Sequence, residues 1–426
     1  MTRGPVEEHV ADVVIVGAGP AGCATATFLA REGVDVLVVD RSTFPRDKVC
    51  GDGLTPRAVS MLRRMGVERR LRDLGYQPIH EYRVVSTWGD AVRAGVPAFG
   101  KAVGYAHVVP RKDLDLLLVD AARRAGASVW EGVRALRASE AGGMPAVEAR
   151  GPDGASLRLR SRVVVAADGS RGSFSRTVTP SPHSEPYAIG MRAYMEGVEG
   201  LDRSLHFFVD RDLLPGYGWI FPSGREGGLF NVGMGLPTRA LRRRPEHLRD
   251  VFDRFLGPGS LAGPYLRGAR LATPPAPFPL RIGLRGGRRR QGNVLLTGDA
   301  ANLIGPLSAE GISYALESGH MAALAIVRAL GSGRLSELAR YDSAVWKELS
   351  ADFLGAYLLR QILARPWANG LMVRLLQRDA GLARGGMGVL SNTVPATWLV
   401  RPVVWRRVFT LRRLAGVVSA HEPARS

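Results

Sequence analysis

The stretch VVIVGAGPAGCATATFLAREGVDVLVVD, residues 13–40, decides the fold. Its first four residues, 13–16, are apolar and predict a buried strand. Residues 20–31 predict a helix that ends at Gly33, and residues 34–40 predict a second buried strand. A strand, a helix and a strand in this order form a βαβ unit, so the chain begins with an α/β architecture.

The turn of this unit, GAGPAG at residues 17–22, fits the pattern G-x-G-x-x-G. Glycines there let backbone amides approach a pyrophosphate at the positive end of the helix, although such a turn also occurs for packing alone. Asp40 ends the second strand, where its carboxylate accepts hydrogen bonds from an adenosine ribose and disfavours a ribose phosphate. FAD or NAD is therefore favoured over NADP. The residues expected at this nucleotide are Gly17, Gly19, Pro20, Ala21, Gly22, Asp40 and Arg41.

Length and composition exclude several classes of protein. The 426 residues allow two or three domains, and 46% hydrophobic with 23% charged residues is ordinary for a globular enzyme. Two cysteines, Cys23 and Cys50, exclude a disulfide framework and favour a reducing compartment, so we expect the cytoplasm. The eight histidines are scattered without paired ligand spacing, and we expect no metal site.

The chain carries a large positive charge. With 58 basic and 39 acidic residues the formal net charge is +19, which favours anionic partners. Either a biased composition or selection for phosphate binding by arginine accounts for this positive charge. Since no recognition motif accompanies the charge, we expect no nucleic-acid binding.

Further elements extend the first unit. Residues 114–127 have helical spacing, residues 128–133, 162–167 and 293–297 predict short strands, and a long helix is expected at 309–330. Segments 188–194, 204–209 and 228–235 alternate and are rich in aromatic residues, as in an antiparallel sheet. The proline cluster at 271–280 predicts a crossover between the two parts.

These elements predict an α/β protein with an α+β second domain. A discontinuous Rossmann-like domain for FAD comprises residues 1–80, 101–180 and 281–330, and an antiparallel-sheet domain for the substrate comprises 81–100 and 181–280. Residues 331–426 form a C-terminal helical region. 

The tail from residue 360 to 426 contains eleven arginines, two acidic residues and interleaved tryptophans, with Phe409 as a further aromatic residue. This composition is typical of a helix that binds an anionic membrane surface, and equally of a solvated helical cap. The first alternative would place the protein at the periphery of the cytoplasmic membrane.

Two later strands each end in a Gly/Asp pair, Asp168-Gly169 and Gly298-Asp299. In this order and spacing they resemble the fingerprints of the FAD-dependent oxidoreductases related to p-hydroxybenzoate hydroxylase. The resemblance implies that Asp299 bonds the ribityl chain and that the amides of Gly311 and Ile312 face the flavin pyrimidine, where a helix N-terminus favours the anionic reduced cofactor. It also implies that Arg111 lies along FAD and that Val133 touches adenine.

Two more segments narrow the resemblance. FPRDKVCGDGLTPRAV (44–59) and LPGYGWIFPSG (214–224) resemble the K-x-C-G-x-G-L-x-P and Y-G-W-x-F-P signatures of the geranylgeranyl reductase family, whose members saturate isoprenoid double bonds. The resemblance covers residues 10–330. The first segment, with Cys50 and Gly51, is then expected over the flavin. The residues expected in the wall of the substrate channel are Tyr217, Trp219, Phe221 and Pro222.

The chain departs from the family at two places. Ser223 replaces the usual lysine after F-P, and Ser308-Ala309 replaces the usual threonine-glycine pair. Cys50 is either an inert small hydrophobic residue or, flanked by glycine and near Lys48, a thiol that supplies a proton. The candidate catalytic residues are Cys50, Lys48, Tyr217 and Trp219.

We therefore expect an FAD-dependent reductase that transfers hydride to an isoprenoid C=C bond, in a geranylgeranyl diphosphate or lipid or in the side chain of menaquinone. A monooxygenase or halogenase of the same superfamily is the alternative, although halogenases carry W-x-W-x-I-P where this chain has YGWIFP at 217–222. A prenyl-binding carrier without activity is an alternative of another class. The electron donor, NAD(P)H or an external carrier, is left open.

Overall fold

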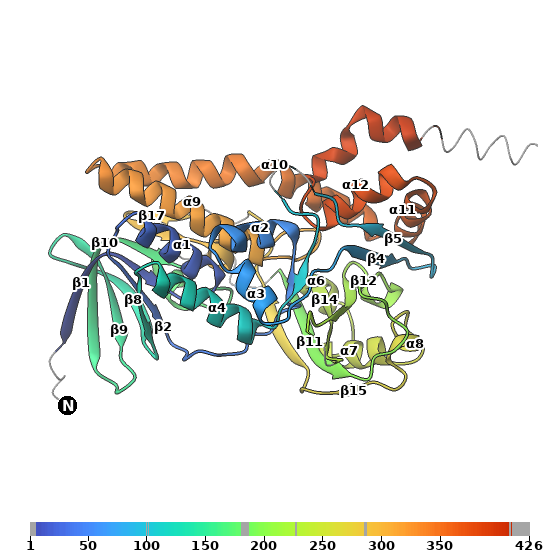
Figure 1. Cartoon of the computed structure of the whole chain (residues 1–426), viewed down its shortest axis with the longest axis horizontal. Coiled ribbons are helices and arrows are strands. Elements are labelled where there is room, and N and C mark those ends of the chain that lie inside the picture. Colours follow the sequence, from blue (N-terminus) through green and yellow to red (C-terminus); the bar gives the residue numbers. More distant parts are fainter. Residues whose placement is uncertain are drawn as a thin grey trace, which may run out of the picture.

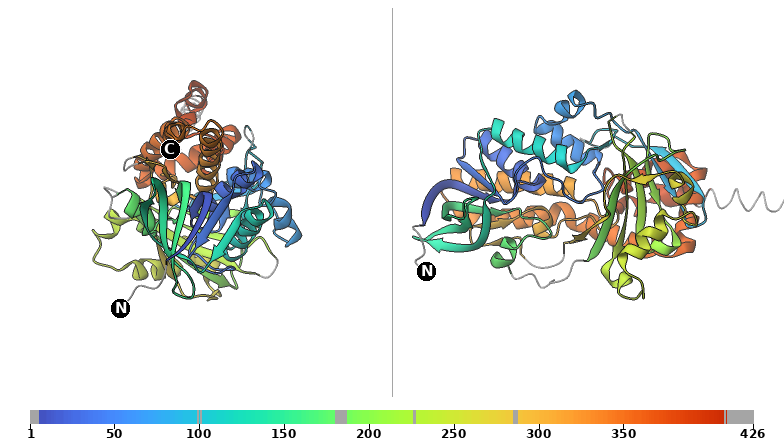
Figure 2. Two further views of the ribbon diagram at one scale, coloured as in Figure 1. Left: turned by 90° about the vertical axis from the view of Figure 1, so that its left-hand side faces the viewer. Right: turned by 90° about the horizontal axis from the view of Figure 1, so that it is seen from below.

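The computed structural model describes residues 6–98, 100, 102–179, 187–225, 228–284, 288–408 and 410. Two large sheets follow one another along the long axis of the molecule, with helices packed over them (Figure 1, Figure 2). Phe409 and residues 411–426 of the predicted basic tail, and residues 180–186 between the two predicted domains, lie outside the described residues.

The first sheet has the strand order β17-β18-β10-β1-β2-β7, with β8 and β9 continuing as an antiparallel meander from β10. Its central pairs are parallel, as the βαβ unit predicts. The strands are β1 (Glu7–Val16), β2 (Val36–Asp40), β7 (Ser128–Glu131), β8 (Arg134–Ala141), β9 (Met144–Arg150), β10 (Ser156–Ala166), β17 (Arg290–Gln291) and β18 (Val294–Leu296).

Strand β1 begins earlier than its apolar run. Residues 13–16 are buried, as predicted, whereas residues 7–10 are mostly exposed and still pair in parallel with β10. Backbone hydrogen bonds to a neighbouring strand extend a strand beyond its hydrophobic part, and that neighbour is 150 residues away in the chain (Glu7 pairs with Leu157). Hydrophobic periodicity therefore located the strand but not its start.

Helices cover the first sheet, and α1 packs against both α4 and α9. Helix α1 (Pro20–Arg31) has its predicted bounds, and α4 (Arg111–Arg124) is the predicted helix shifted by three residues. Helix α9 (Ile312–Gly331) starts at residue 312 rather than 309, because Ala309 is left-handed (φ 51°) and Gly311 caps the helix. Shorter helices are α2 (Pro56–Arg64), α3 (Glu68–Asp73), α5 (Phe174–Val178) and η2 (Gly298–Ala301).

The second sheet has the order β15-β11-β14-β13-β12-β4-β5, and β16 also pairs with β11. All its pairs are antiparallel except β12 with β4. The strands are β4 (Glu81–Val85), β5 (Ala91–Gly95), β11 (Ala188–Glu196), β12 (Leu205–Phe208), β13 (Tyr217–Pro222), β14 (Phe230–Pro237), β15 (Arg270–Leu271) and β16 (Ala276–Leu280). Helices η1 (Arg211–Leu213), α6 (Thr238–Leu241), α7 (Leu248–Leu256) and α8 (Gly263–Leu266) accompany it, and β3 (Gly53–Leu54) pairs with β6 (His107–Val108) in a small separate sheet.

The proline cluster at 271–280 is not the simple crossover that its composition predicts. Residues 276–280 form β16, in which Pro277 pairs with Met191 and Pro279 with Ile189. Proline has no N–H to donate, so it is tolerated in a strand that pairs on one side only. The chain does return to the first sheet after Leu280, as predicted, but the prediction missed this strand because the free edge of β11 that accepts it is distant in sequence.

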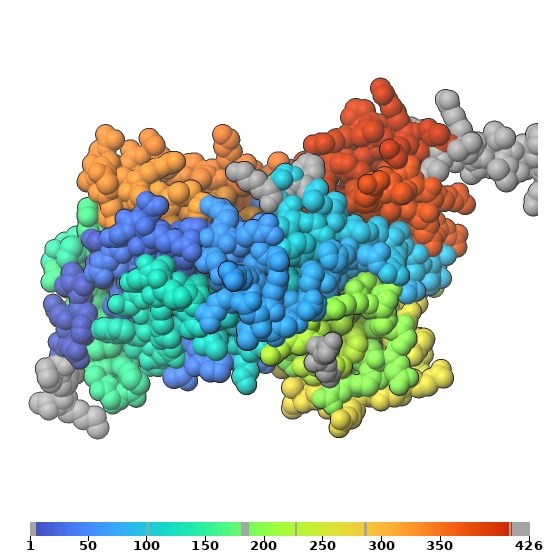
Figure 3. Space-filling view, viewed as in Figure 1, coloured from blue at the N-terminus to red at the C-terminus, as the bar shows by residue number. Residues whose placement is uncertain are grey.

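The C-terminal region is helical, as predicted. It comprises η3 (Leu335–Leu338), α10 (Ala339–Leu363), α11 (Pro366–Arg378), α12 (Ala380–Leu390) and η4 (Ala396–Val400). Helices α11 and α12 pack on β5, and a Cβ added to Gly370 would lie 2.3 Å from the Trp88 ring. In the space-filling view these helices (red) project at the end opposite to β1 (Figure 3). The segment 366–390 is thus a cap on the second sheet.

The contact between α1 and α9 gives the first prediction. A Cβ on Gly319 would lie 2.4 Å from the backbone oxygen of Ala21, so Gly319→Val forces the two helices apart. We expect a loss of about 1–3 kcal/mol in the free energy of unfolding, measured by urea denaturation. Gly331→Ala, whose Cβ meets nothing within 4 Å, is the control and leaves the stability equal or slightly higher. Equal stability of both variants would contradict the close packing.

Candidate functional site

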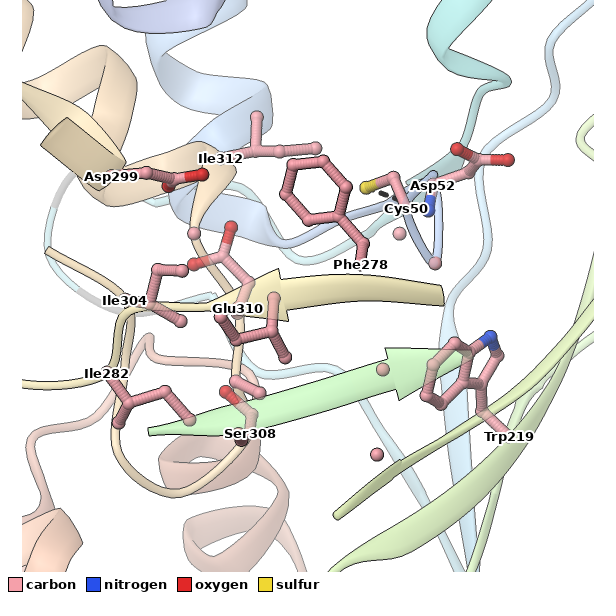
Figure 4. Close-up of a pocket in the computed structure, with 18 of the residues that line it drawn as sticks. Cys50, Asp52, Trp219, Phe278, Ile282, Asp299, Ile304, Ser308, Glu310 and Ile312 are labelled. Atoms are coloured by element: carbon pink, nitrogen blue, oxygen red, sulfur yellow. Dashed lines mark hydrogen bonds between the residues drawn. The ribbon is translucent and has the colours of Figure 1, made fainter. Parts of the chain in front are cut away.

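A large cavity lies where the two sheets meet, and it encloses about 1650 Å³ of space, counting its opening to solvent. Parts of the chain that are far apart in sequence line it together. They include the turn after β1, the loop before β3, the segment before α9, one face of β13, and Arg360 and Leu390 from the C-terminal helices. Figure 4 shows side chains from several of these segments around the same space.

The glycine turn at residues 17–22 is shaped by close backbone approaches. Gly17 has φ 105° and a Cβ there would lie 2.5 Å from the Ala167 carbonyl oxygen; a Cβ on Gly22 would lie 1.8 Å from the Gly17 oxygen. Gly19, in contrast, faces open space, with nothing within 4 Å of an added Cβ. Gly19, Pro20 and Ala21 line the cavity, so this turn leaves room for a ligand at the N-terminus of α1.

Asp40 holds the turn from the end of β2. Its Oδ2 accepts a hydrogen bond from the Ala18 backbone N–H at 2.8 Å, and the Val133 N–H donates to the Asp40 carbonyl at 2.9 Å. The structure thus brings Val133 and Asp40 together, as expected for one adenosine site. Neither lines the cavity, and Arg41 is exposed beyond the strand.

Asp168 and Gly169 differ in where they point. Gly169 lines the cavity, whereas the Asp168 carboxylate accepts from the Ser175 backbone N–H at 3.0 Å, at the start of α5. Burial raises the pKa of Asp168. Its carboxyl therefore organises the loop that follows β10, and the structure does not bring it to the cavity.

Asp299 lies at the cavity and faces Lys48. Its Oδ2 accepts a hydrogen bond from the Ser170 hydroxyl at 3.0 Å and lies 3.7 Å from Lys48 Nζ. Burial lowers the pKa of Lys48, whose ammonium also lies 5.0 Å from the centre of the Phe278 ring. Gly311 caps α9 and Ile312 is its first residue, and both line the same space. Ile312 is labelled in Figure 4.

Arg111 begins α4 at the cavity. It is buried and makes a bidentate pair with Asp115, with two N–O distances of 2.7 Å. Arg46 adds a second guanidinium at 2.8 Å from the same carboxylate. Two guanidinium groups therefore share one carboxylate beside the cavity.

Ser308 and Ala309 stand where the family has threonine and glycine. Ala309 adopts φ 51°, a left-handed conformation that glycine reaches at lower cost. The Tyr217 hydroxyl donates to the Ser308 carbonyl, so the loop before α9 is tied to β13 by its backbone. Because the loop takes part through its backbone, this contact does not require a particular side chain at residue 308.

Cys50 and Gly51 line the cavity opposite that loop. The Cys50 sulfur accepts from the Asp52 backbone N–H at 3.3 Å, and burial raises the pKa of the thiol. Cys50 is therefore a neutral thiol at neutral pH. A Cβ on Gly51 would lie 3.5 Å from the Trp219 ring, so the loop and the wall of the second sheet are in contact.

The aromatic side chains of β13 lie on the cavity side. Tyr217, Trp219 and Phe221 all line it, while Ile220 between them packs in the core on the other face of the sheet. Pro222, at the end of the strand, does not line it. The two-residue period of a strand separates these sets.

Sequence patterns missed several residues of the cavity. They are Asp52, Tyr194, Asn231, Glu310 and Arg360, of which Asp52, Glu310 and Arg360 line it directly. Asp52 stands at a variable position of the K-x-C-G-x-G signature, and Tyr194 and Asn231 read as ordinary strand residues. In the sequence Asp52 is marked only by its place between two glycines, which assigns it no role.

Comparison with known proteins identifies the protein family. A model described as "FAD binding domain" matches residues 10–195. Menaquinone reductase of Mycobacterium tuberculosis is 34% identical over 418 residues, covering 95% of this chain and 97% of that protein. Digeranylgeranylglycerophospholipid reductase 2 of Methanopyrus kandleri is 30% identical, covering 79% of this chain and 82% of its own length.

Solved structures agree on the fold. A geranylgeranyl bacteriochlorophyll reductase-like protein from Thermoplasma acidophilum superposes with a TM-score of 0.80 at 21% identity, covering 95% of this chain and all of that one. A flavin-dependent brominase gives a TM-score of 0.75 at 17% identity, with 97% and 100% covered. The predicted α/β fold is confirmed, and the chain is an FAD-dependent oxidoreductase that belongs to the geranylgeranyl reductase family, together with the menaquinone reductases.

Proposed function

We propose that this enzyme saturates C=C bonds of a polyprenyl substrate, in the side chain of menaquinone or in a geranylgeranyl lipid or diphosphate. The observation that carries the proposal is that one cavity joins the FAD motifs to the aromatic face of β13. Relatives named for reduction of menaquinone and of a geranylgeranyl lipid support the class of substrate.

The residues present fit FAD. The open space at Gly19 lies at the uncapped N-terminus of α1, where a pyrophosphate is favoured. We propose that Asp40 and Val133 hold the adenosine end, that Asp299 holds the ribityl chain, and that the N-terminus of α9 holds the flavin ring. FAD, when bound and reduced, supplies hydride to the substrate.

The chain's own residues provide the slot for the substrate. Tyr217, Trp219 and Phe221 with Phe207, Tyr82 and Leu280 give an apolar lining that excludes water from the alkene. The neutral Cys50 thiol holds a proton at the same surface, and Lys48 holds the Asp299 carboxylate. Positioning and water exclusion are what addition of hydrogen to an unactivated alkene requires.

An anaerobic turnover experiment tests the reaction. We expect enzyme whose flavin has been reduced chemically under argon to convert a geranylgeranyl lipid or menaquinone into a product that is two mass units heavier for each saturated bond. The readout is mass spectrometry of the extracted isoprenoids. A requirement for oxygen would overturn the proposal in favour of a monooxygenase or halogenase.

Gly19→Val tests the cofactor site. Because an added Cβ at Gly19 meets no protein atom within 4 Å, we expect a folded protein whose side chain occupies the pyrophosphate space and whose melting temperature equals that of the wild type stripped of FAD. FAD, measured by its visible absorption after purification, should be lost. Gly268→Val is the control, since this exposed glycine has the same free space outside the cavity and should leave FAD bound. A yellow Gly19→Val protein would contradict the assignment.

We also propose that the enzyme docks on an anionic membrane surface. None of the helices in the described part of the chain combines the length and apolar composition needed to span a bilayer. Helices α10 and α11 instead expose apolar side chains, which we call the apolar stripe: Leu354 (60% exposed), Leu358 (54%), Ile362 (56%), Trp367 (57%) and Leu371 (39%).

Spacing and charge both favour a lipid surface as the partner. The three α10 residues of the apolar stripe are four residues apart, which places them on one face of the helix. Exposed arginines, Arg365 and Arg378, accompany them, and the chain as a whole carries +19. The other side of α10 contributes Arg360 to the cavity, so one helix connects the proposed membrane surface to the slot for the lipid chain.

The double variant L358E/I362E tests this surface. Burying each side chain in a bilayer contributes about 1.5–3 kcal/mol, so we expect the double variant to bind vesicles that contain phosphatidylglycerol at least about tenfold more weakly. Co-sedimentation at low salt is the measurement. Val10→Glu, at an equally exposed apolar residue (66%) on β1 at the opposite end of the molecule, should bind like the wild type. Equal binding of all three proteins would exclude the surface.

A further inference from the structure

Arg360 differs from the other cationic side chains that line the cavity. The other three each lie within 4.0 Å of a carboxylate, in the pairs Lys48–Asp299, Arg111–Asp115 and Arg192–Asp47. Arg360 also lines the cavity and is only 9% exposed, yet within the described part of the chain it forms no ion pair. It is therefore a buried cation to which the described residues offer no counterion.

Two tyrosines hold the Arg360 guanidinium in place. Its Nη2 donates a hydrogen bond to the Tyr187 hydroxyl, just before β11. Its central carbon lies 4.6 Å from the centre of the Tyr187 ring and 5.3 Å from that of Tyr357, one turn earlier on α10. Aromatic rings attract a cation without neutralising it. The guanidinium is thus positioned while its charge stays uncompensated.

Part of the guanidinium is available to a ligand. Nε and Nη1 of Arg360 have no hydrogen-bond partner among the described residues, yet neither atom is sealed from solvent. A planar guanidinium that keeps free N–H groups matches the oxygens of a phosphate, to which it donates parallel hydrogen bonds.

The carboxylates that line the cavity have other partners. Asp52 Oδ2 accepts hydrogen bonds from Tyr194 and Asn231, and Asp299 faces Lys48. The remaining one, Glu310, accepts a hydrogen bond at 2.7 Å from the Ser313 N–H in the first turn of α9. Because burial of a charge without a counterion costs free energy, a bound anion stabilises this arrangement.

Arg360 also stands where the polar end of a lipid would lie. It projects from α10, whose outer side carries the apolar stripe, and it borders the same cavity as the aromatic wall of β13. An amphiphile drawn from a membrane would place its apolar chain along that wall and leave its head group beside α10.

We propose that Arg360 binds the phosphate of an anionic polyprenyl substrate, and that this contact selects such substrates over neutral menaquinone. The inference rests on the proposed function and narrows its substrate class. The phosphate belongs either to a diphosphate on the polyprenyl chain or to the head group of a phospholipid, and the experiment distinguishes these two sources.

Arg360→Gln removes the charge and keeps a polar side chain. We expect the KM for geranylgeranyl diphosphate, or for a digeranylgeranyl phospholipid, to rise at least about tenfold, the size of a lost charge-assisted hydrogen bond, with kcat nearly unchanged. The KM for geranylgeraniol, which has the same chain without phosphate, should stay at the wild-type value. The phosphate compound that shows the rise identifies the source. These rates are measured anaerobically in detergent with chemically reduced enzyme.

Matched variants separate ligand binding from a structural role. Lys347→Gln removes one positive charge from the exposed side of the same helix and should keep every KM. Arg360→Lys keeps the charge without the planar fork and should recover part of the affinity for phosphate. Tyr187→Phe removes the hydroxyl that holds Arg360, so we expect a smaller rise in KM, again confined to phosphate substrates. If Arg360 only ties α10 to Tyr187, geranylgeraniol and its diphosphate will weaken alike in these variants, and the proposal is wrong.

A binding measurement without turnover completes the test. Calorimetric titration of the oxidised, FAD-loaded wild type and Arg360→Gln with geranylgeranyl diphosphate and geranylgeraniol should show weaker binding of the diphosphate alone. If the wild type reduces no polyprenyl substrate, the proposed function fails, and this titration still decides whether Arg360 binds phosphate. Wild-type affinity of Arg360→Gln for both phosphate compounds, or a lower wild-type KM for menaquinone than for either of them, would refute the inference. Should Arg360→Gln lose its FAD, Arg360→Lys takes its place in the same comparison.

Discussion

The side-chain amide of Asn231 is the interaction on which the site depends. From β14 it reaches the Cys50 carbonyl and the Asp52 carboxylate with its nitrogen, and the Trp219 indole with its oxygen. It therefore ties the loop that leaves the first sheet to the aromatic face of the second. Because the amide is buried, its bonds have no competing water, and loss of any partner would leave a polar group unsatisfied.

A second constraint comes from parallel strands. The carboxyl ends of β1, β2, β10 and β18 lie along one edge of the first sheet, and each is followed by a motif that the sequence analysis singled out. Ligands of open α/β sheets bind outside these ends. Hence the glycine turn, Asp40, Gly169 and Asp299 gather at one place although the chain separates them by up to 282 residues (Gly17 to Asp299).

The C-terminal helices add what the dinucleotide fold lacks. Helices α11 and α12 cover β5, and α10 carries Arg360 at the cavity and the apolar stripe outside. The basic composition of the tail had left a cap and a membrane helix as alternatives. The structure shows residues 366–390 packed as a cap, and the surface that this cap leaves exposed is what we propose to bind lipid.

The sequence by itself determined the βαβ unit, the glycine turn and the alternation of Tyr217, Trp219 and Phe221, because these depend on neighbours within a few residues. It also indicated the family, because each of the two signature segments, 44–59 and 214–224, is continuous in the sequence. Only the tertiary structure decided that Asp168 turns to α5, that the prolines of β16 complete the second sheet, and that Asp52, Tyr194 and Asn231 meet. Those outcomes depend on which distant segment offers a free strand edge or a hydrogen-bond donor, and on burial. These long-range factors do not appear as a periodic pattern in the sequence.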